Sequence, residues 1–208
     1  MSIVSYNNRS IRNITAIPGA AGSLTHIKTL TASSSGTLAF VDGASDVVLD
    51  NTYPIYVFKF INIHAATADA NFQVDFSDDT GSSYDTAKTT TSFRARHKED
   101  GSGAALEYRA NADQANSGAT YQTIAENLST GNDDNGNGEL YLFNPSSTTY
   151  AKHFLGRFTS YQHSEGGNQD QFTAGYVNIT AAVDAVLFRF SSGNIDAGTI
   201  KLYGLKDS

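Results

Sequence analysis

The stretch DAVLFRFSSGNIDAGTIKLYGL, residues 184–205, decides the fold. Side chains alternate between the two faces of a β-strand, and the first half of this stretch places Val186, Phe188 and Phe190 on one face. A turn rich in Ser, Gly and Asn follows, and residues 199–205 form a second alternating run. The pattern predicts two antiparallel strands joined by a turn, with one face buried.

Similar alternation recurs upstream and predicts further strands. They are expected at residues 24–31, 36–42, 47–49, 53–64, 72–76, 89–97, 105–109, 140–143, 150–162 and 172–180. Short strands with turn-rich joints favour an all-β fold, an antiparallel β-sandwich resembling a jelly roll. Tyr121, Ile124, Ala125 and Leu128 follow helical spacing, so we expect at most one short helix.

Amino-acid composition argues against several classes of site and partner. The chain has 208 residues, no cysteine and a formal net charge of −7. The missing thiols exclude disulfides and thiolate metal sites, and the acidic balance argues against binding to a phosphate backbone. No apolar run is long enough to span a bilayer, and the first residues do not form a secretion signal. We therefore expect neither a nucleic-acid nor a membrane partner.

Residues 1–23 differ from the rest because they contain no acidic residue and are locally positive. We predict an extended N-terminal arm over residues 1–23 and one sandwich domain over residues 24–208, with an edge strand and loop as an equally open interpretation of the first segment. A positive arm on an acidic protein suits docking on an acidic neighbour. The candidate docking residues are Ile3, Val4, Tyr6, Arg9 and Arg12.

Residues 77–84, SDDTGSSY, resemble the Asp-box pattern Ser-x-Asp-x-Gly-x-Thr-aromatic. In such a turn the Asp side chain accepts bonds from turn amides and Gly adopts a positive φ. We interpret the segment as a structural turn and not as a catalytic one. The five matching positions are Ser77, Asp79, Gly81, Ser83 and Tyr84.

An amide-rich and acidic segment is a weak candidate for calcium. Asp133, Asn135 and Asn137 match the opening of a calcium-binding loop, but Asn144 stands where a bidentate Glu is needed. A solvated turn is the favoured interpretation, and we expect no metal and no cofactor.

The strongest basic run places Arg94, Arg96 and Lys98 on one strand face, opposite Phe93 and His97. A solvated outer face is the first interpretation, and contact with an acidic partner is the second. Eleven tyrosines and twelve phenylalanines will bring some aromatic rings to the surface, which suits subunit interfaces or sugar stacking. The sequence contains no nucleophile elbow, phosphate loop or zinc-spaced histidine pair, so we expect no catalytic residues and no enzyme.

Six stretches carry a family resemblance. They are HIKTLTASSS (26–35), YVFKFINIH (56–64), GSSYD (81–85), FNPSSTTY (143–150), AVDAV (182–186) and SSGNIDAGTIKLYG (191–204). Together they resemble a group of small structural proteins from tailed bacteriophages of marine bacteria, including those that infect cyanobacteria.

The resemblance implies a jelly-roll virion component, assembled in the host cytoplasm, with no catalytic residues to carry over. The expected function is that of a capsid decoration or cement protein, a homotrimer that docks through its arm on the major capsid protein or another virion protein. The alternative is a tail-fibre or appendage subunit that binds a host surface glycan or receptor. The short length and the lack of a fibrous repeat favour decoration.

Overall fold

The computed structural model describes residues 24–206, so the predicted arm, with all five candidate docking residues, lies outside the described part. Within residues 24–206, thirteen strands form one continuous antiparallel sheet and no residue is helical. The all-β, antiparallel prediction is therefore confirmed. The strands are β1 (Leu24–Ser35), β2 (Thr37–Val41), β3 (Ile55–Ala65), β4 (Ala70–Ser77), β5 (Lys88–Lys98), β6 (Ala104–Tyr108), β7 (Gln114–Ser117), β8 (Gln122–Leu128), β9 (Gly136–Phe143), β10 (Lys152–Gln162), β11 (Gly167–Val177), β12 (Ala185–Phe190) and β13 (Ile195–Leu205).

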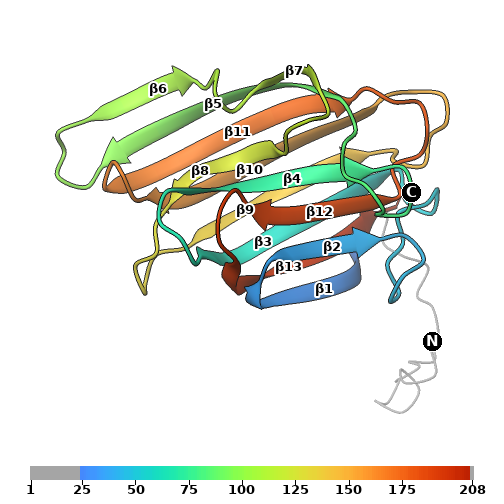
Figure 1. Ribbon diagram of the computed structural model, residues 1–208, viewed down its shortest axis with the longest axis horizontal. Coiled ribbons are helices and arrows are strands. Elements are labelled where there is room, and N and C mark those ends of the chain that lie inside the picture. Colours follow the sequence, from blue (N-terminus) through green and yellow to red (C-terminus); the bar gives the residue numbers. More distant parts are fainter. Residues whose placement is uncertain (1–23, 207–208) are drawn as a thin grey trace, which may run out of the picture.

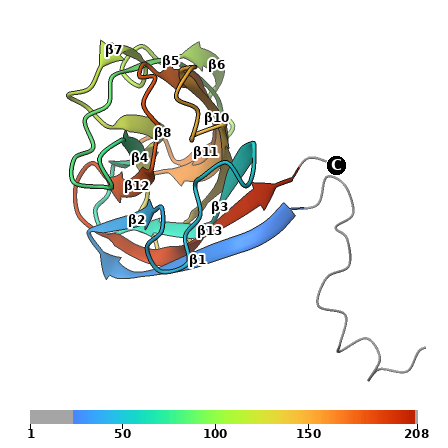
Figure 2. The same cartoon turned by 90° about the vertical axis from the view of Figure 1, so that its right-hand side faces the viewer.

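The sheet folds over on itself into two layers (Figure 1). The front layer has the order β8-β4-β12-β2, and the back layer has the order β1-β13-β3-β9-β10-β11-β5. The short strands β6 and β7 both pair with the far edge of β5. In the strand ladder, β8 of the front layer pairs with β10 of the back layer through one residue pair, Leu128 with Gln162. Seen from the side, the layers curve around the interior and nearly close it into a barrel (Figure 2).

Aromatic side chains fill one part of the interior. The front layer contributes Phe72 and Phe188, and the back layer contributes Phe58 and Phe158. All four are at most 1 % exposed, as expected for the inward positions of alternating strands. This arrangement confirms the buried face predicted for residues 184–190.

The rest of the interior is polar. Inward positions of β5, β11 and β8 carry buried hydrophilic side chains, which are Lys88, Thr90, Ser92, Arg94, Gln169, Gln171, Gln122 and Glu126. Arg94 is only 4 % exposed, whereas Phe93 on the opposite face is 44 % exposed. The predicted solvated outer face is therefore wrong for Arg94, which lies inside the fold, whereas Arg96 and Lys98 remain partly exposed and form ion pairs with acidic groups of this chain. Arg94 and Arg96 both bind Glu107.

The predicted helix is a strand. Residues 122–128 form β8, which pairs with β4 and reaches β10. Nearly all of its side chains are buried, so apolar residues occur on both faces and their spacing also fits a helix. Residues 47–49 are likewise not a strand, although Val47 and Leu49 are buried. The amide of Leu49 donates to the Asp42 carboxylate at 2.8 Å, which holds this segment as a buried loop.

The last two strands do not pair with each other. β12 lies between β4 and β2 in the front layer, and β13 lies between β1 and β3 in the back layer. The turn around Gly193 therefore carries the chain from one layer to the other, and the expected neighbouring pair is wrong.

Candidate interaction surface

A row of aligned side chains crosses the outer face of the back layer. The register pairs Tyr108 of β6 with Phe93 of β5, Phe93 with Phe172 of β11, and Phe172 with Arg157 of β10. The rings of Phe93 and Phe172 stack with centroids 4.9 Å apart and an interplanar angle of 6°. The Arg157 guanidinium lies 5.0 Å from the centre of Phe172. The stack forms a rigid ridge, because each group restrains the next.

Apolar side chains remain exposed around this ridge. We call the set Phe93, Leu106, Tyr108, Leu155 and Phe172 the outer patch. Leu106 is 76 % exposed and Tyr108 is 59 % exposed. Large apolar side chains that cluster on a protein surface, as these do, often mark a site of interaction with another molecule.

Two shallow apolar depressions lie beside the outer patch. One has a volume of about 160 Å³ and is lined by Leu155, Gly156 and Ala174, together with the two stacked rings. The other, of about 270 Å³, extends along β5, β10 and β11 toward His153 and Gly175. The small residues Gly156, Ala174 and Gly175 leave room for these depressions. The protruding side chains of the outer patch therefore lie next to recessed apolar surface on the same face.

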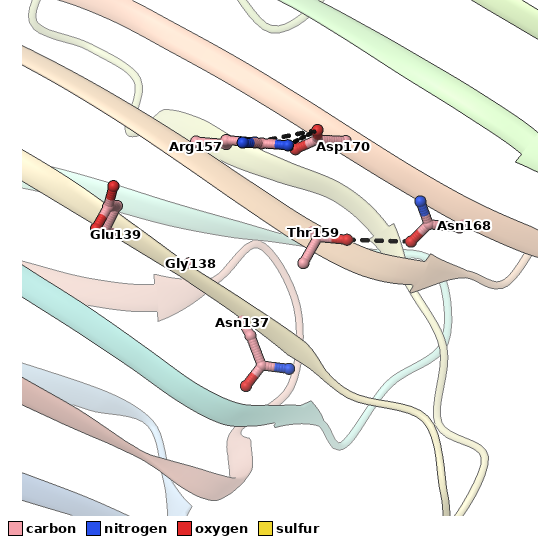
Figure 3. A pocket seen from close by; sticks show the side chains of 7 residues that line it. All are labelled: Asn137, Gly138, Glu139, Arg157, Thr159, Asn168 and Asp170. Atoms are coloured by element: carbon pink, nitrogen blue, oxygen red, sulfur yellow. Dashed lines mark hydrogen bonds and ion pairs between the residues drawn. The ribbon is translucent and has the colours of Figure 1, made fainter.

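A polar depression of about 440 Å³ lies on the other side of the ridge (Figure 3). The Arg157 guanidinium donates to both Asp170 carboxylate oxygens at 2.7–3.1 Å, and Thr159 donates to Asn168 at 3.0 Å. The hydrogen bonds to Asp170 raise the pKa of Arg157. Glu139 forms an ion pair with Lys59. Amide, hydroxyl and charged groups thus stand next to an aromatic row.

The Asp-box-like residues lie in one turn after β4. Ser77 Oγ donates to Asp79 Oδ1 at 2.7 Å and accepts from the Gly81 amide at 2.9 Å. The amide and hydroxyl of Ser83 each donate to the Asp79 carboxylate at 2.9 Å, and these bonds hold the pKa of Asp79 below its ordinary value. Gly81 has a φ of +77°, and Tyr84 is half-buried. The side-chain bonds organise the turn and leave no activated group.

The three candidate calcium residues do not line one common depression, although the Asn137 amide donates to Asn135 Oδ1. Asp133 and Asn135 line a depression of about 410 Å³ with His64 and Asp196, whereas Asn137 lines the polar depression beside the ridge. In the described part of the chain, no group of three or more His, Cys, Asp or Glu residues is arranged to hold a metal ion.

No protein-family model, curated protein or solved structure matches this chain. Among residues 24–206, no helix is long and apolar enough to cross a membrane.

Sequence reasoning did not single out the exposed members of the outer patch. Leu106 and Leu155 sit in strands that were predicted, but their alternation does not reveal which face meets solvent. Only the pairing of β5 with β6 and β11 brings these residues together with Phe93.

Proposed function

We propose that this protein is a non-enzymatic structural component of a bacteriophage virion, a capsid decoration protein that self-associates and docks on the shell. The outer patch carries the proposal, because an apolar ridge with adjoining depressions suits burial against another protein. The family resemblance of residues 26–204 supports the virion context.

We propose a second copy of this chain, in a homotrimer, as the occupant of the outer patch. Leu106 and Tyr108 protrude from the edge strand β6, and the depressions near Ala174 lie two strands away on the same face. A protrusion of one subunit that fills the depression of the next makes a head-to-tail contact, and such contacts form a closed trimer when each subunit is rotated by a third of a turn from the last. Stable interfaces of this kind bury on the order of 1,600 Å² in total.

We also propose that the two-layer fold is of the jelly-roll type. Four strands of the front layer alternate along the chain with strands of the back layer, so that β2, β4, β8 and β12 are each preceded and followed by back-layer strands. This alternation between two antiparallel layers is typical of jelly-roll sandwiches.

Electron cryo-microscopy of purified particles tests the location. We expect regular density for this protein over the capsid lattice. Density confined to the tail, the fibres or a single vertex would reject decoration in favour of the attachment machinery.

We predict that the double substitution Phe93→Ser/Leu155→Ser weakens self-association by about 100-fold, because two apolar anchors are removed from the interface. Both side chains are nearly half exposed, so the fold should tolerate the change. Sedimentation velocity measures the effect, and Tyr150→Ser is the matched control, because Tyr150 is 71 % exposed and lies outside the outer patch. A wild-type chain that stays monomeric, or a double variant that associates normally, would contradict the proposal.

Removal of residues 1–23 is predicted to abolish attachment to particles while the domain stays folded. The deleted segment contains Arg9 and Arg12 and no acidic residue, so it supplies the positive charge proposed to dock on the shell. Co-sedimentation with particles measures attachment, and circular dichroism checks the fold. Attachment of the truncated chain at the wild-type level would show that docking uses another surface.

A tail-fibre or appendage subunit that binds a host surface glycan is the second candidate. The polar depression favours it, because Asp170, Asn168 and Arg157 offer the donors and acceptors that sugar hydroxyls require. Glycan-array binding by the purified chain, together with tail density on particles, would support this candidate over decoration.

A further inference from the structure

Two oppositely charged side chains are completely buried where the front and back layers meet. Asp75 of β4 and Lys88, the first residue of β5, are both 0 % exposed. The Lys88 Nζ atom lies 2.5 Å from Asp75 Oδ1. Val74 and Phe76 face the apolar core, so Asp75 points away from it and toward the segment that leads into β5.

Hydrogen bonding around this pair is incomplete when both groups are charged. A lysine ammonium has three N–H donors, and two acceptors meet it, Asp75 Oδ1 and the carbonyl oxygen of Thr86 at 2.7 Å. Asp75 Oδ1 also accepts from the Phe76 amide at 2.8 Å, but the buried Oδ2 atom has no protein partner. A buried donor or acceptor without a partner lowers the stability of the fold, so the free energy of the charged form of this pair is high.

We propose that Lys88 and Asp75 condense into an intramolecular isopeptide bond. A proton passes from the Lys88 ammonium to the Asp75 carboxylate, which leaves a neutral amine beside a neutral carboxylic acid. The Nζ lone pair attacks Cγ and forms the C–N bond. A second proton moves from nitrogen to the departing oxygen, the C–O bond breaks, and one water molecule leaves. No oxidant, reductant or other reactant is required.

The surroundings of Asp75 shift this residue toward its protonated form. Burial raises the pKa of Asp75 to about 6, against the opposing effect of the Lys88 charge, so the protonated acid is accessible near neutral pH. The product also satisfies its surroundings better than the ion pair does. An amide has one N–H, which the Thr86 carbonyl accepts, and one carbonyl oxygen, to which the Phe76 amide can donate.

The bond would be a covalent cross-link between the two layers, in a chain that has no cysteine and so no disulfide. It would join β4 of the front layer to β5 of the back layer and close a loop over residues 75–88. Cross-links of this type stabilise a fold chiefly by restricting the unfolded chain. The inference is independent of the proposed function, because it concerns the chemistry of the isolated chain.

Lys152 provides an internal comparison. It is also 0 % exposed, but its Nζ atom donates to the backbone carbonyl oxygens of Ile179, Thr180 and Ala181. None of the ion pairs among the described residues gives it a carboxylate. A buried lysine without an acid beside it has nothing to condense with, so Lys152 should remain a free amine.

Mass spectrometry of the purified full chain tests the proposal. We expect an intact mass lower than the sequence mass by one water. After denaturation and trypsin digestion, cleavage after Lys88 should fail, and the deficit should map to a peptide of residues 60–94. Backbone fragments from inside the closed loop should be missing.

Two variants serve as controls. Lys88→Arg keeps the positive charge but cannot condense in this way, so its mass should equal the sequence mass. Lys152→Arg should retain the deficit. A full wild-type mass with normal cleavage after Lys88 overturns the proposal. So does a deficit that persists in Lys88→Arg or maps to another peptide, such as one containing Asp100-Gly101, where a cyclic imide also forms by loss of water.

Discussion

Replacement of Phe188 by alanine is expected to lower the free energy of unfolding by about 3–5 kcal/mol. Phe188 is 0 % exposed and lies at the centre of the aromatic core. Its ring centroid lies 5.1–6.3 Å from four other rings, which belong to Phe40, Phe58, Phe60 and Phe72. These rings come from both layers, so the cavity left by the substitution cannot close without moving the layers against each other.

Urea unfolding of the Phe188→Ala variant, followed by circular dichroism, measures this loss. Tyr150→Ala is the control, because Tyr150 is 71 % exposed and its removal should cost less than about 1 kcal/mol. Equal losses in the two variants would show that the aromatic core does not stabilise the fold as described.

Alternation in the sequence predicts strands well but not their partners. Val186, Phe188 and Phe190 face the core as expected, because a period of two fixes which side chains share a face. The same pattern carries no information on pairing, and β12 pairs with strands that begin about 115 and 150 residues earlier in the chain. Distant pairings of this kind are set by how the whole sheet folds over.

The outer patch shows a second limit. Hydrophobicity alone predicts that Phe93 is buried and that Arg94 is exposed. In the structure Phe93 is exposed and Arg94 is buried. The rule fails on β5 because its inward face meets carboxylates and amides of β6, β8 and β11, which satisfy polar side chains inside the fold. A strand with polar residues at one set of alternate positions and apolar residues at the other can therefore face either way.

The buried charges give the second large effect. Glu126 is 1 % exposed and accepts from the Arg109 guanidinium at 2.7 and 3.0 Å and from the Asn111 amide at 2.8 Å. It also lies 3.9 Å from the buried Arg94 guanidinium. Glu126→Ala is expected to lower the free energy of unfolding by about 3–5 kcal/mol, because it removes the buried partner of Arg109 and Asn111 and leaves Glu107 alone to neutralise the buried Arg94.

Glu165→Ala is the matched control for urea unfolding of Glu126→Ala. Glu165 forms ion pairs with two residues of the basic run, Arg96 at 2.8 Å and Lys98 at 3.0 Å, but its side chain is 31 % exposed. Water can solvate the charges left behind, so we expect a loss of about 0–1 kcal/mol. Salt should reduce the small effect at Glu165 and leave the large effect at Glu126 nearly unchanged, because mobile ions screen exposed pairs more than buried ones. Similar losses with similar salt dependence at both positions would contradict a buried polar interior.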